Sequence, residues 1–366
     1  MTEAIKNLIQ TRIRQDIVSM HAYAIQDSVG MVKLDAMENP HRLPADLQQQ
    51  LGERLGKLAL NRYPDGRVND LRTALAAYAD MPAGYDLMLG NGSDELISLL
   101  ALACDVPGAT ILAPLPGFVM YAMSAQLQGL KFVGVDLTAD FELDLLAMLA
   151  AIAQHKPAIT YLAYPNNPTA NLWDEKAMAQ IIAAMDEIGG LVVLDEAYQP
   201  FSSKTYLDTI RANPAAHAHV LLMRTLSKFG LAGVRMGYMM GPKPLIAEID
   251  KVRPPYNISV LNYECALFAL EYKEVFSKQA IELIAQRAIL FDALSGIPNV
   301  KAFKSDANMM LLRVPDPQKT FEGMKAKGVL VKNVSKMHPL LTGCLRLTVG
   351  TAEENATMVA AIKASL

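Results

Sequence analysis

The sequence has few cysteines, little net charge and no long apolar run. Its three cysteines, Cys104, Cys265 and Cys344, are far apart and form no CxxC pair. They therefore offer neither a metal pair nor a disulfide framework, and they indicate a reducing compartment. A net charge of −3 over 366 residues gives no excess of positive charge that would indicate binding to nucleic acid or to an anionic membrane. Since no apolar run approaches the length of a membrane span, we expect a cytoplasmic protein with no nucleic-acid or membrane partner.

Targeting and metal-binding signals are also missing. Residues 1–16 mix both charge signs without a continuous apolar block, so we do not expect a signal peptide. Ile5, Leu8, Ile9 and Ile13 instead share a helical face, which predicts an arm that packs on the body or on a partner subunit. The six histidines form no HExxH or similar pair, so no metal is expected.

The sequence has enough hydrophobic residues for a large core, and its predicted strands alternate with a predicted helix. It is 52% hydrophobic, and its length predicts about two domains. Residues 158–163, 191–194 and 219–223 are short apolar runs typical of buried strands, and apolar residues at 3-4 spacing over 178–188 predict a helix. This order predicts an α/β fold with a mostly parallel sheet covered on both faces. Ligands of such sheets bind at the carboxyl ends of the strands.

Polar residues follow each of the three predicted strands. The first strand precedes Tyr164–Thr169, which contains Asn167; the second is followed by Asp195 and Tyr198; and the third leads to Lys228. Taken singly, the first stretch could be a plain turn and the second a capping carboxylate. Together they offer an amide, a carboxylate with a phenol, and a lysine at one edge of a sheet.

Lys228 is well placed to form a Schiff base with a carbonyl cofactor. Burial and neighbouring cations lower a lysine's pKa toward the nucleophilic neutral amine. Pyridoxal phosphate requires this set of residues: Lys228 to hold the aldehyde and move the proton, and Asp195 to pair with the pyridine nitrogen. Asn167 and Tyr198 would hydrogen-bond the phenolic oxygen of the ring. The catalytic residues we predict are therefore Lys228, Asp195 and Tyr198.

The cofactor phosphate requires donors near a helix N-terminus. A glycine-containing loop with Gly92, Ser93 and Asp94 precedes apolar residues at helical spacing, so its backbone N–H groups could approach an anion. The alternative is an ordinary helix cap at Ser93, and the carboxylate of Asp94 restricts any contact there to the backbone. The other predicted donors are Thr225, Ser227 and Arg235, the last as a two-pronged clamp.

In this order the motifs resemble the fold-type-I, pyridoxal-phosphate-dependent aminotransferases, and most closely their histidinol-phosphate branch. The resemblance covers nearly the whole chain, from residues 34–40 and 62–66 through the glycine loop and the Lys228 segment to residues 345–354. It implies a large domain with a mostly parallel sheet flanked by helices, plus a smaller α+β domain. We expect an N-terminal arm with part of the small domain at 1–40, the large domain at 41–260 and the small domain at 261–366.

The resemblance also implies roles for individual residues. Phe118 matches the aromatic residue that stacks on the cofactor ring, although a core phenylalanine is an equal alternative from the residues alone. Tyr63 matches a tyrosine that reaches the cofactor phosphate of the neighbouring subunit, which implies a homodimer with shared sites. Many relatives have one more residue between the lysine and the phosphate arginine than the step from Lys228 to Arg235, so this loop must turn more tightly.

On the substrate side, the resemblance implies contacts at Tyr23, Asn39, Asn167, Lys332 and Arg346. Arg346 matches the arginine that binds the anionic end of the substrate, and Lys332 stands where some relatives have a second arginine for the substrate phosphate.

The implied reaction is the reversible exchange of an amino group between histidinol phosphate and 2-oxoglutarate, a step of histidine biosynthesis. Alternatives within the fold are an aromatic or broad-range aminotransferase and a phosphothreonine decarboxylase. A noncatalytic module that binds pyridoxal phosphate is disfavoured because the lysine is present and no DNA-binding segment is appended. A nicotinamide dehydrogenase is disfavoured because the glycine loop lacks the third glycine of the dinucleotide motif.

Overall fold

The computed structural model describes residues 2–20 and 26–366, and the chain divides into two units at residues 31 and 32. The described residues of the first unit include two helices, α1 (Glu3–Arg12) and α2 (Gln15–Val18). The predicted N-terminal helix is thus present, and none of its side chains is buried. The partner surface expected for this arm stays a prediction.

The second unit is built around a seven-stranded sheet with the order β2-β8-β7-β6-β5-β3-β4. All of its strands run parallel except β8, which is antiparallel to both of its neighbours. Its strands are β2 (Tyr85–Gly90), β3 (Thr110–Leu115), β4 (Lys131–Asp136), β5 (Ile159–Ala163), β6 (Leu191–Asp195), β7 (Val220–Thr225) and β8 (Gly237–Pro242). The three strands expected from the sequence are β5, β6 and β7, each within two residues of its predicted ends.

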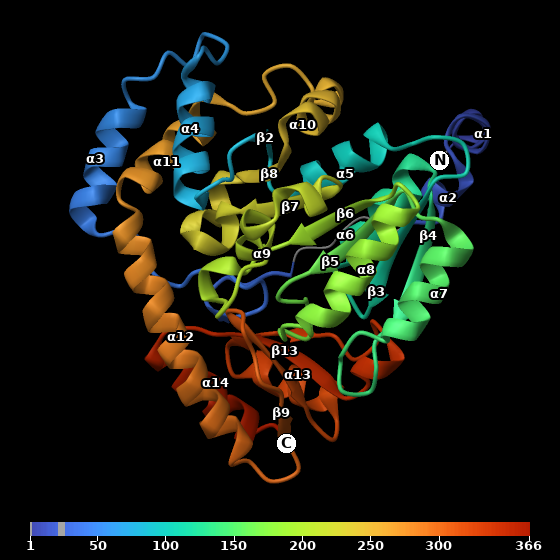
Figure 1. Ribbon diagram of the computed structural model, residues 1–366. Helices are drawn as coiled ribbons and strands as arrows, with labels where there is room; N and C mark the ends of the chain where they lie inside the picture. Colours follow the sequence, from blue (N-terminus) through green and yellow to red (C-terminus); the bar gives the residue numbers. More distant parts are fainter. Residues whose placement is uncertain (1, 21–25) are drawn as a thin grey trace. The chain divides into compact units, whose positions relative to one another are not determined.

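Helices cover both faces of this sheet (Figure 1). Helices α5, α6 and α10 pack on one face, and α4, α7, α8 and α9 pack on the other. Their bounds are α4 (Arg67–Ala79), α5 (Ser93–Ala103), α6 (Val119–Gln128), α7 (Leu145–His155), α8 (Glu175–Glu187), α9 (Leu207–Ala212) and α10 (Lys243–Ile249). The predicted helix over 178–188 is α8, which begins after Asp174 because that side chain accepts the N–H of Ala177 at 3.1 Å.

The core follows the alternation of side chains along the strands. In β6, Val192 and Leu194 belong to the cluster on the α8 side of the sheet, whereas Val193 belongs to the cluster on the α5 side. Successive strand residues point to opposite faces, so a strand buried on both faces is apolar throughout. This explains why these strands appear in the sequence as continuous apolar runs.

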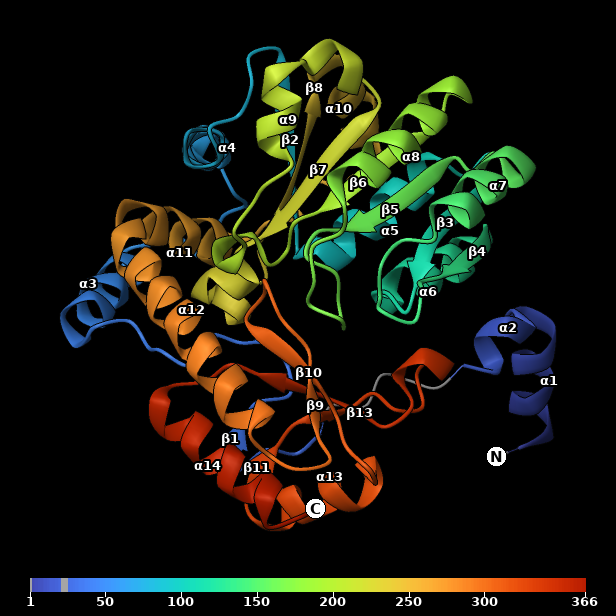
Figure 2. The ribbon, with the colours of Figure 1, turned by 60° about the horizontal axis from the view of Figure 1, so that its bottom comes forward.

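The C-terminal part of the chain forms a second, four-stranded sheet with the order β12-β13-β10-β9 (Figure 2). Its strands are β9 (Lys301–Ala302), β10 (Met309–Arg313), β12 (Lys332–Asn333) and β13 (Cys344–Thr348). A separate two-stranded sheet pairs β1 (Val32–Lys33) with β11 (Val329–Leu330) in parallel. The remaining helices are α3 (Ala45–Leu55), α11 (Val260–Glu271), α12 (Lys273–Ser295), α13 (Pro317–Ala326) and α14 (Ala352–Lys363).

The sheet that pairs β1 with β11 joins the segment before residue 41 to the C-terminal part of the chain. Residues 32–366 nevertheless form one compact unit, so the domain limits at 40/41 and 260/261 stay predictions. Within the described ranges, no helix is long and apolar enough to cross a membrane. The three cysteines are free, and of the three only Cys344 is buried.

Candidate active site

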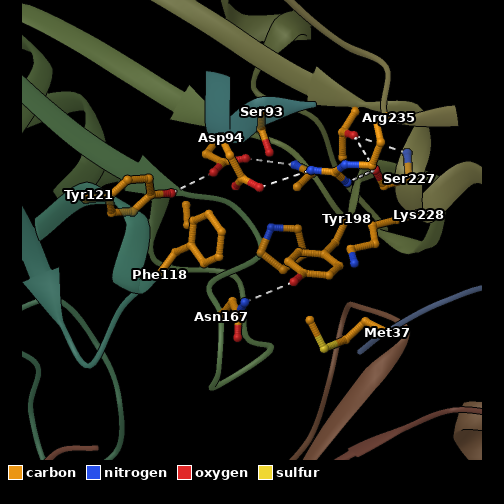
Figure 3. Close-up of a pocket in the computed structure, with 15 residues that line it drawn as sticks. Met37, Ser93, Asp94, Phe118, Tyr121, Asn167, Tyr198, Ser227, Lys228 and Arg235 are labelled. Carbon is orange, nitrogen blue, oxygen red and sulfur yellow. Dashed lines mark hydrogen bonds and ion pairs between the residues drawn. The ribbon is translucent and has the colours of Figure 1, made fainter. Parts of the chain in front are cut away.

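The carboxyl ends of β5, β6 and β7 lie side by side, and residues at these ends line one pocket, which Figure 3 shows. Ala163 is opposite Asp195, and Asp195 is opposite Met223, in the parallel ladders. The polar residues that follow the three strands therefore meet in space, as predicted for a parallel sheet. The pocket contains ten of the predicted site residues: Ser93, Asp94, Phe118, Asn167, Asp195, Tyr198, Thr225, Ser227, Lys228 and Arg235.

Lys228 lies on a short helical turn, Ser227–Leu231, directly after β7. Its ammonium donates a hydrogen bond to the carbonyl oxygen of Ala36 at 2.9 Å. Burial lowers the pKa of Lys228 to about 8, and the nearby positive charge of Arg346 contributes in the same direction. Near neutral pH this lysine thus has far more neutral amine than an exposed one, as a nucleophile or proton acceptor requires.

Asp195 is the last residue of β6 and is buried. Tyr121 donates its hydroxyl proton to Oδ2 at 2.6 Å, and the N–H of Ala197 donates to Oδ1 at 3.0 Å. Burial raises the pKa of Asp195 to about 6 in spite of these two donors. No cation pairs with this carboxylate within the described part of the chain. A positively charged group entering the pocket would provide the missing counter-charge.

Asn167 connects two other predicted residues. Its amide nitrogen donates to the hydroxyl of Tyr198 at 3.0 Å, and its amide oxygen accepts from Arg346 Nη1 at 2.9 Å. Arg346, on β13, also donates to the backbone oxygen of Asp35 at 2.8 Å. The arginine thus lies just behind the pocket wall, although it does not line the pocket itself.

The N-terminus of α5 forms a corner rich in hydrogen-bond donors. Gly92 has φ +80°, a left-handed conformation that favours glycine, and a Cβ there would lie 2.8 Å from Arg235 Nη2. Arg235 donates to Ser227 Oγ at 3.3 Å and pairs with Asp94 at 3.1 Å. Thr225 Oγ1 accepts the N–H of Ser227 at 3.1 Å. The guanidinium, the hydroxyls and the helix N-terminus together suit an anion.

The loop from Lys228 to Arg235 contains two residues with positive φ. Gly230 has φ +141° and interrupts the helical turn, residues 232–234 form a 3-10 turn, and Arg235 itself has φ +54°. These left-handed residues reverse the chain within seven positions. With only seven positions from Lys228 to Arg235, the guanidinium of Arg235 still lies in the pocket.

Sequence reasoning did not assign a role to Tyr121, which also lines this pocket. Phe118 precedes the first turn of α6 and Tyr121 lies three residues later, so both face the same side of the helix. Their rings meet edge to face at 5.6 Å. The i,i+3 spacing from Phe118 was the one signal in the sequence for Tyr121. Met37, with φ +52°, is another lining residue that was missed.

Five predicted residues that the structure describes do not line the pocket: Asn39, Tyr63, Gly92, Lys332 and Arg346. Asn39 uses its amide nitrogen to bond Gln279 at 2.9 Å, and Tyr63 is exposed and stacks on Tyr256 at 4.6 Å. Lys332 is directly opposite Arg346 in the β12–β13 ladder, which places both side chains on one face of the sheet. The roles given to Asn39, Tyr63, Lys332 and Arg346 stay predictions. Tyr23, also predicted to contact the substrate, lies outside the described residues.

No metal cluster is apparent in the described ranges: no three His, Cys, Asp or Glu residues there are grouped as ligands.

The comparisons with known proteins agree on one family, the aminotransferases. Residues 29–362 match the family described as "Aminotransferase class I and II". A histidinol-phosphate aminotransferase from Polaromonas naphthalenivorans (strain CJ2) is 76% identical over 97% of this chain and 96% of its own. One from Methylibium petroleiphilum (strain ATCC BAA-1232 / LMG 22953 / PM1) is 68% identical over 97% and 94%.

Solved structures share the fold. The histidinol-phosphate aminotransferase from Sinorhizobium meliloti, solved in complex with pyridoxal-5'-phosphate, has a TM-score of 0.83 at 22% identity, over 96% of this chain and 97% of its own. The predicted fold-type-I architecture is therefore confirmed. With a family match across nine-tenths of its length and relatives this similar, the chain belongs to the aminotransferase class I and II family.

Proposed function

We propose that the chain is a pyridoxal-phosphate-dependent transaminase that exchanges an amino group between L-histidinol phosphate and 2-oxoglutarate. The observation that carries the proposal is one pocket in which Lys228, with a pKa of about 8, lies with the buried carboxylate of Asp195. The relatives at 76% and 68% identity, both named for histidinol phosphate, support the choice of substrate.

The pocket residues fit pyridoxal phosphate. Asp195 is a buried carboxylate in need of a counter-charge, which a protonated ring nitrogen provides. The corner at Gly92 leads into the N-terminus of α5, where the first backbone N–H groups of the helix suit a phosphate. When bound, pyridoxal phosphate supplies an electron-withdrawing ring that stabilises negative charge at the amine-bearing carbon of the substrate.

In this proposal each residue around the cofactor ring has a separate role. Lys228 would take a proton from the amine-bearing carbon of the substrate and deliver it to the cofactor carbon that receives the amino group, which its lowered pKa permits. Asp195 would keep the ring nitrogen protonated, while Asn167 and Tyr198, already bonded to each other, would hold the phenolic oxygen. Phe118 would pack against the ring face.

The phosphate and the substrate are held by cations and donors at the two ends of the pocket. Ser227, Arg235 and the N-terminus of α5 hold the phosphate of the cofactor. Arg346 binds the anionic end of the substrate, and its bond to Asn167 links that end to the cofactor ring. In this proposal Lys332, opposite Arg346 on the neighbouring strand, adds a second positive charge for the substrate phosphate.

We also propose a cytoplasmic homodimer with shared sites. The three free cysteines suit a reducing compartment. The exposed stack of Tyr63 on Tyr256 offers an aromatic surface that a second subunit would cover.

The test compares the purified wild type with Lys228→Ala and with the control Lys204→Ala, which removes an exposed lysine. Wild type and Lys204→Ala should convert histidinol phosphate with 2-oxoglutarate, absorb visible light and be labelled on the chain by borohydride. Lys228→Ala should lose all three properties. Undiminished transamination by Lys228→Ala would contradict the mechanism.

A substrate panel tests the choice of donor. Preference for phenylalanine or tyrosine would reassign the chain to the aromatic or broad-range group. Carbon dioxide release from phosphothreonine without a keto-acid acceptor would instead indicate a decarboxylase.

A further inference from the structure

The hydroxyl of Tyr121 has a single partner in the pocket, the carboxylate of Asp195. The donor–acceptor distance of 2.6 Å is short, as expected for a bond to a charged oxygen. The tyrosine is buried, with 2% of its surface exposed, so water does not compete for this bond. Burial also raises the pKa of Tyr121 well above its ordinary value, which keeps the hydroxyl a donor at every physiological pH.

The ring of Tyr121 is fixed on two sides. It stacks on Tyr161 with centroids 4.3 Å apart and planes 8° from parallel, and it meets Phe118 edge to face. These contacts leave the ring little freedom to rotate, so the hydroxyl points at Oδ2 before any ligand arrives. Prepared hydrogen bonds of this kind cost no reorganisation during the reaction.

Asp195 needs such a donor because its surroundings oppose its charge. Burial raises its pKa, and two nearby carboxylates, Asp94 and Glu196, do the same. The hydroxyl of Tyr121 and the N–H of Ala197 act in the opposite direction and lower it. The other titratable groups that face Asp195 are the hydroxyls of Tyr161 on β5 and Tyr198 beyond β6.

We propose that Tyr121 is a positioning residue, whose hydroxyl holds Asp195 ionised and oriented for the ring nitrogen of the cofactor. Its bond to Oδ2 and the Ala197 bond to Oδ1 fix the plane of the carboxylate from two directions. The inference rests on the proposed function, since it assumes that Asp195 faces a protonated ring nitrogen.

The chain contains a matched control. Tyr161 is also a buried tyrosine, on the other side of the same ring stack, and its hydroxyl has no hydrogen-bond partner in the described part of the protein. Tyr161→Phe and Tyr121→Phe thus remove the same atom from neighbouring sites. Only the second change removes a bond to Asp195.

The experiment is an equilibrium titration of each apoprotein with pyridoxal phosphate, followed by absorbance, together with pH profiles of kcat/KM for the holoenzymes. Tyr121→Phe should raise the cofactor Kd roughly ten-fold or more, as expected for one hydrogen bond to a buried charge. The acid limb of its profile should move to higher pH, because the pKa of Asp195 rises when a donor is lost. Tyr161→Phe should leave both unchanged.

A double-mutant cycle separates this role from general packing. If Tyr121 acts through Asp195, then Tyr121→Phe should change the Kd little in an Asp195→Asn background. An equal loss in both backgrounds, or a Tyr121→Phe protein with wild-type Kd and pH profile, would overturn the inference. A wild type that does not bind pyridoxal phosphate would instead refute the proposed function on which the inference rests. Thermal unfolding of each variant establishes that it is folded.

Discussion

Gly237 begins β8 and lies against the loop that leads into α5. In the ladders it is opposite Gly90 on β2 and Thr225 on β7. A Cβ at this position would be 2.6 Å from the carbonyl carbon of Gly92 and 2.8 Å from the backbone nitrogen of Ser93. Both are main-chain atoms, so no side-chain rotation can relieve the contact. Gly237→Ala must therefore push the loop away from the sheet.

The size of the effect follows from these distances. Forcing one extra carbon into a packed region costs about 1–3 kcal/mol, and we expect the upper half of this range because both colliding atoms are backbone. The movement also displaces the backbone N–H groups at the start of α5, so the affinity for pyridoxal phosphate should fall by roughly ten-fold, the equivalent of about 1.4 kcal/mol.

Urea unfolding of the apoprotein measures the first quantity, and a cofactor titration measures the second. Gly233→Ala is the control, because a Cβ at Gly233 meets no heavy atom within 4 Å and its φ is not positive. That variant should be neutral or slightly stabilised. If Gly237→Ala unfolds at the same urea concentration as Gly233→Ala and binds the cofactor equally well, then the close approach at Gly92 does not shape the site.

Three further predictions concern charges in and below the pocket. Arg346→Gln should raise the pKa of Lys228 above about 8, because the arginine's charge lowers it; amine labelling of the apoprotein at pH 8 should slow, and an unchanged rate would exclude this coupling. Arg224→Met removes the guanidinium that pairs with the buried carboxylate of Glu196 at 2.9 Å, which should lower the free energy of unfolding in urea by about 3–5 kcal/mol. A loss of less than about 1 kcal/mol would contradict this prediction. The pKa of Asp195 rises to about 6 on folding, so its protonated form favours the folded apoprotein, and this stability is lost as the pH rises from about 4 through 6. Asp195→Asn should therefore stabilise the apoprotein at pH 7, by at most about 3 kcal/mol, while weakening cofactor binding; a less stable variant would refute this.

The sequence was sufficient for the elements nearest the chemistry. Strands β5, β6 and β7 are buried on both faces, so each appeared as a continuous apolar run. Because parallel strands end at one edge of a sheet, the polar residues after each run could be expected to meet. The helix α8 was clear from residue 178 onward, since its apolar residues repeat at helical spacing, but its first turn after Asp174 was not predicted.

Contacts between distant segments were not predictable in this way. The bond from Tyr121 to Asp195 joins α6 to the end of β6, 74 residues away, and nothing in either local pattern requires it. The same holds for Lys228 and the carbonyl of Ala36, which are 192 residues apart. A loop such as residues 34–40 has no periodicity, and its place is decided by what it packs on.

The sequence by itself determined which chemical groups meet at the site, because a lysine, a carboxylate and an amide each lie at or just beyond the carboxyl end of a strand in one mostly parallel sheet. Only the tertiary structure decided how these groups are tuned. Burial and neighbouring charges give Lys228 a pKa of about 8 and Asp195 a pKa of about 6, and the folded chain brings Tyr121 and Arg346 within reach of them. Desolvation and charge proximity are properties of the packed molecule, whereas residue type and strand order are properties of the sequence.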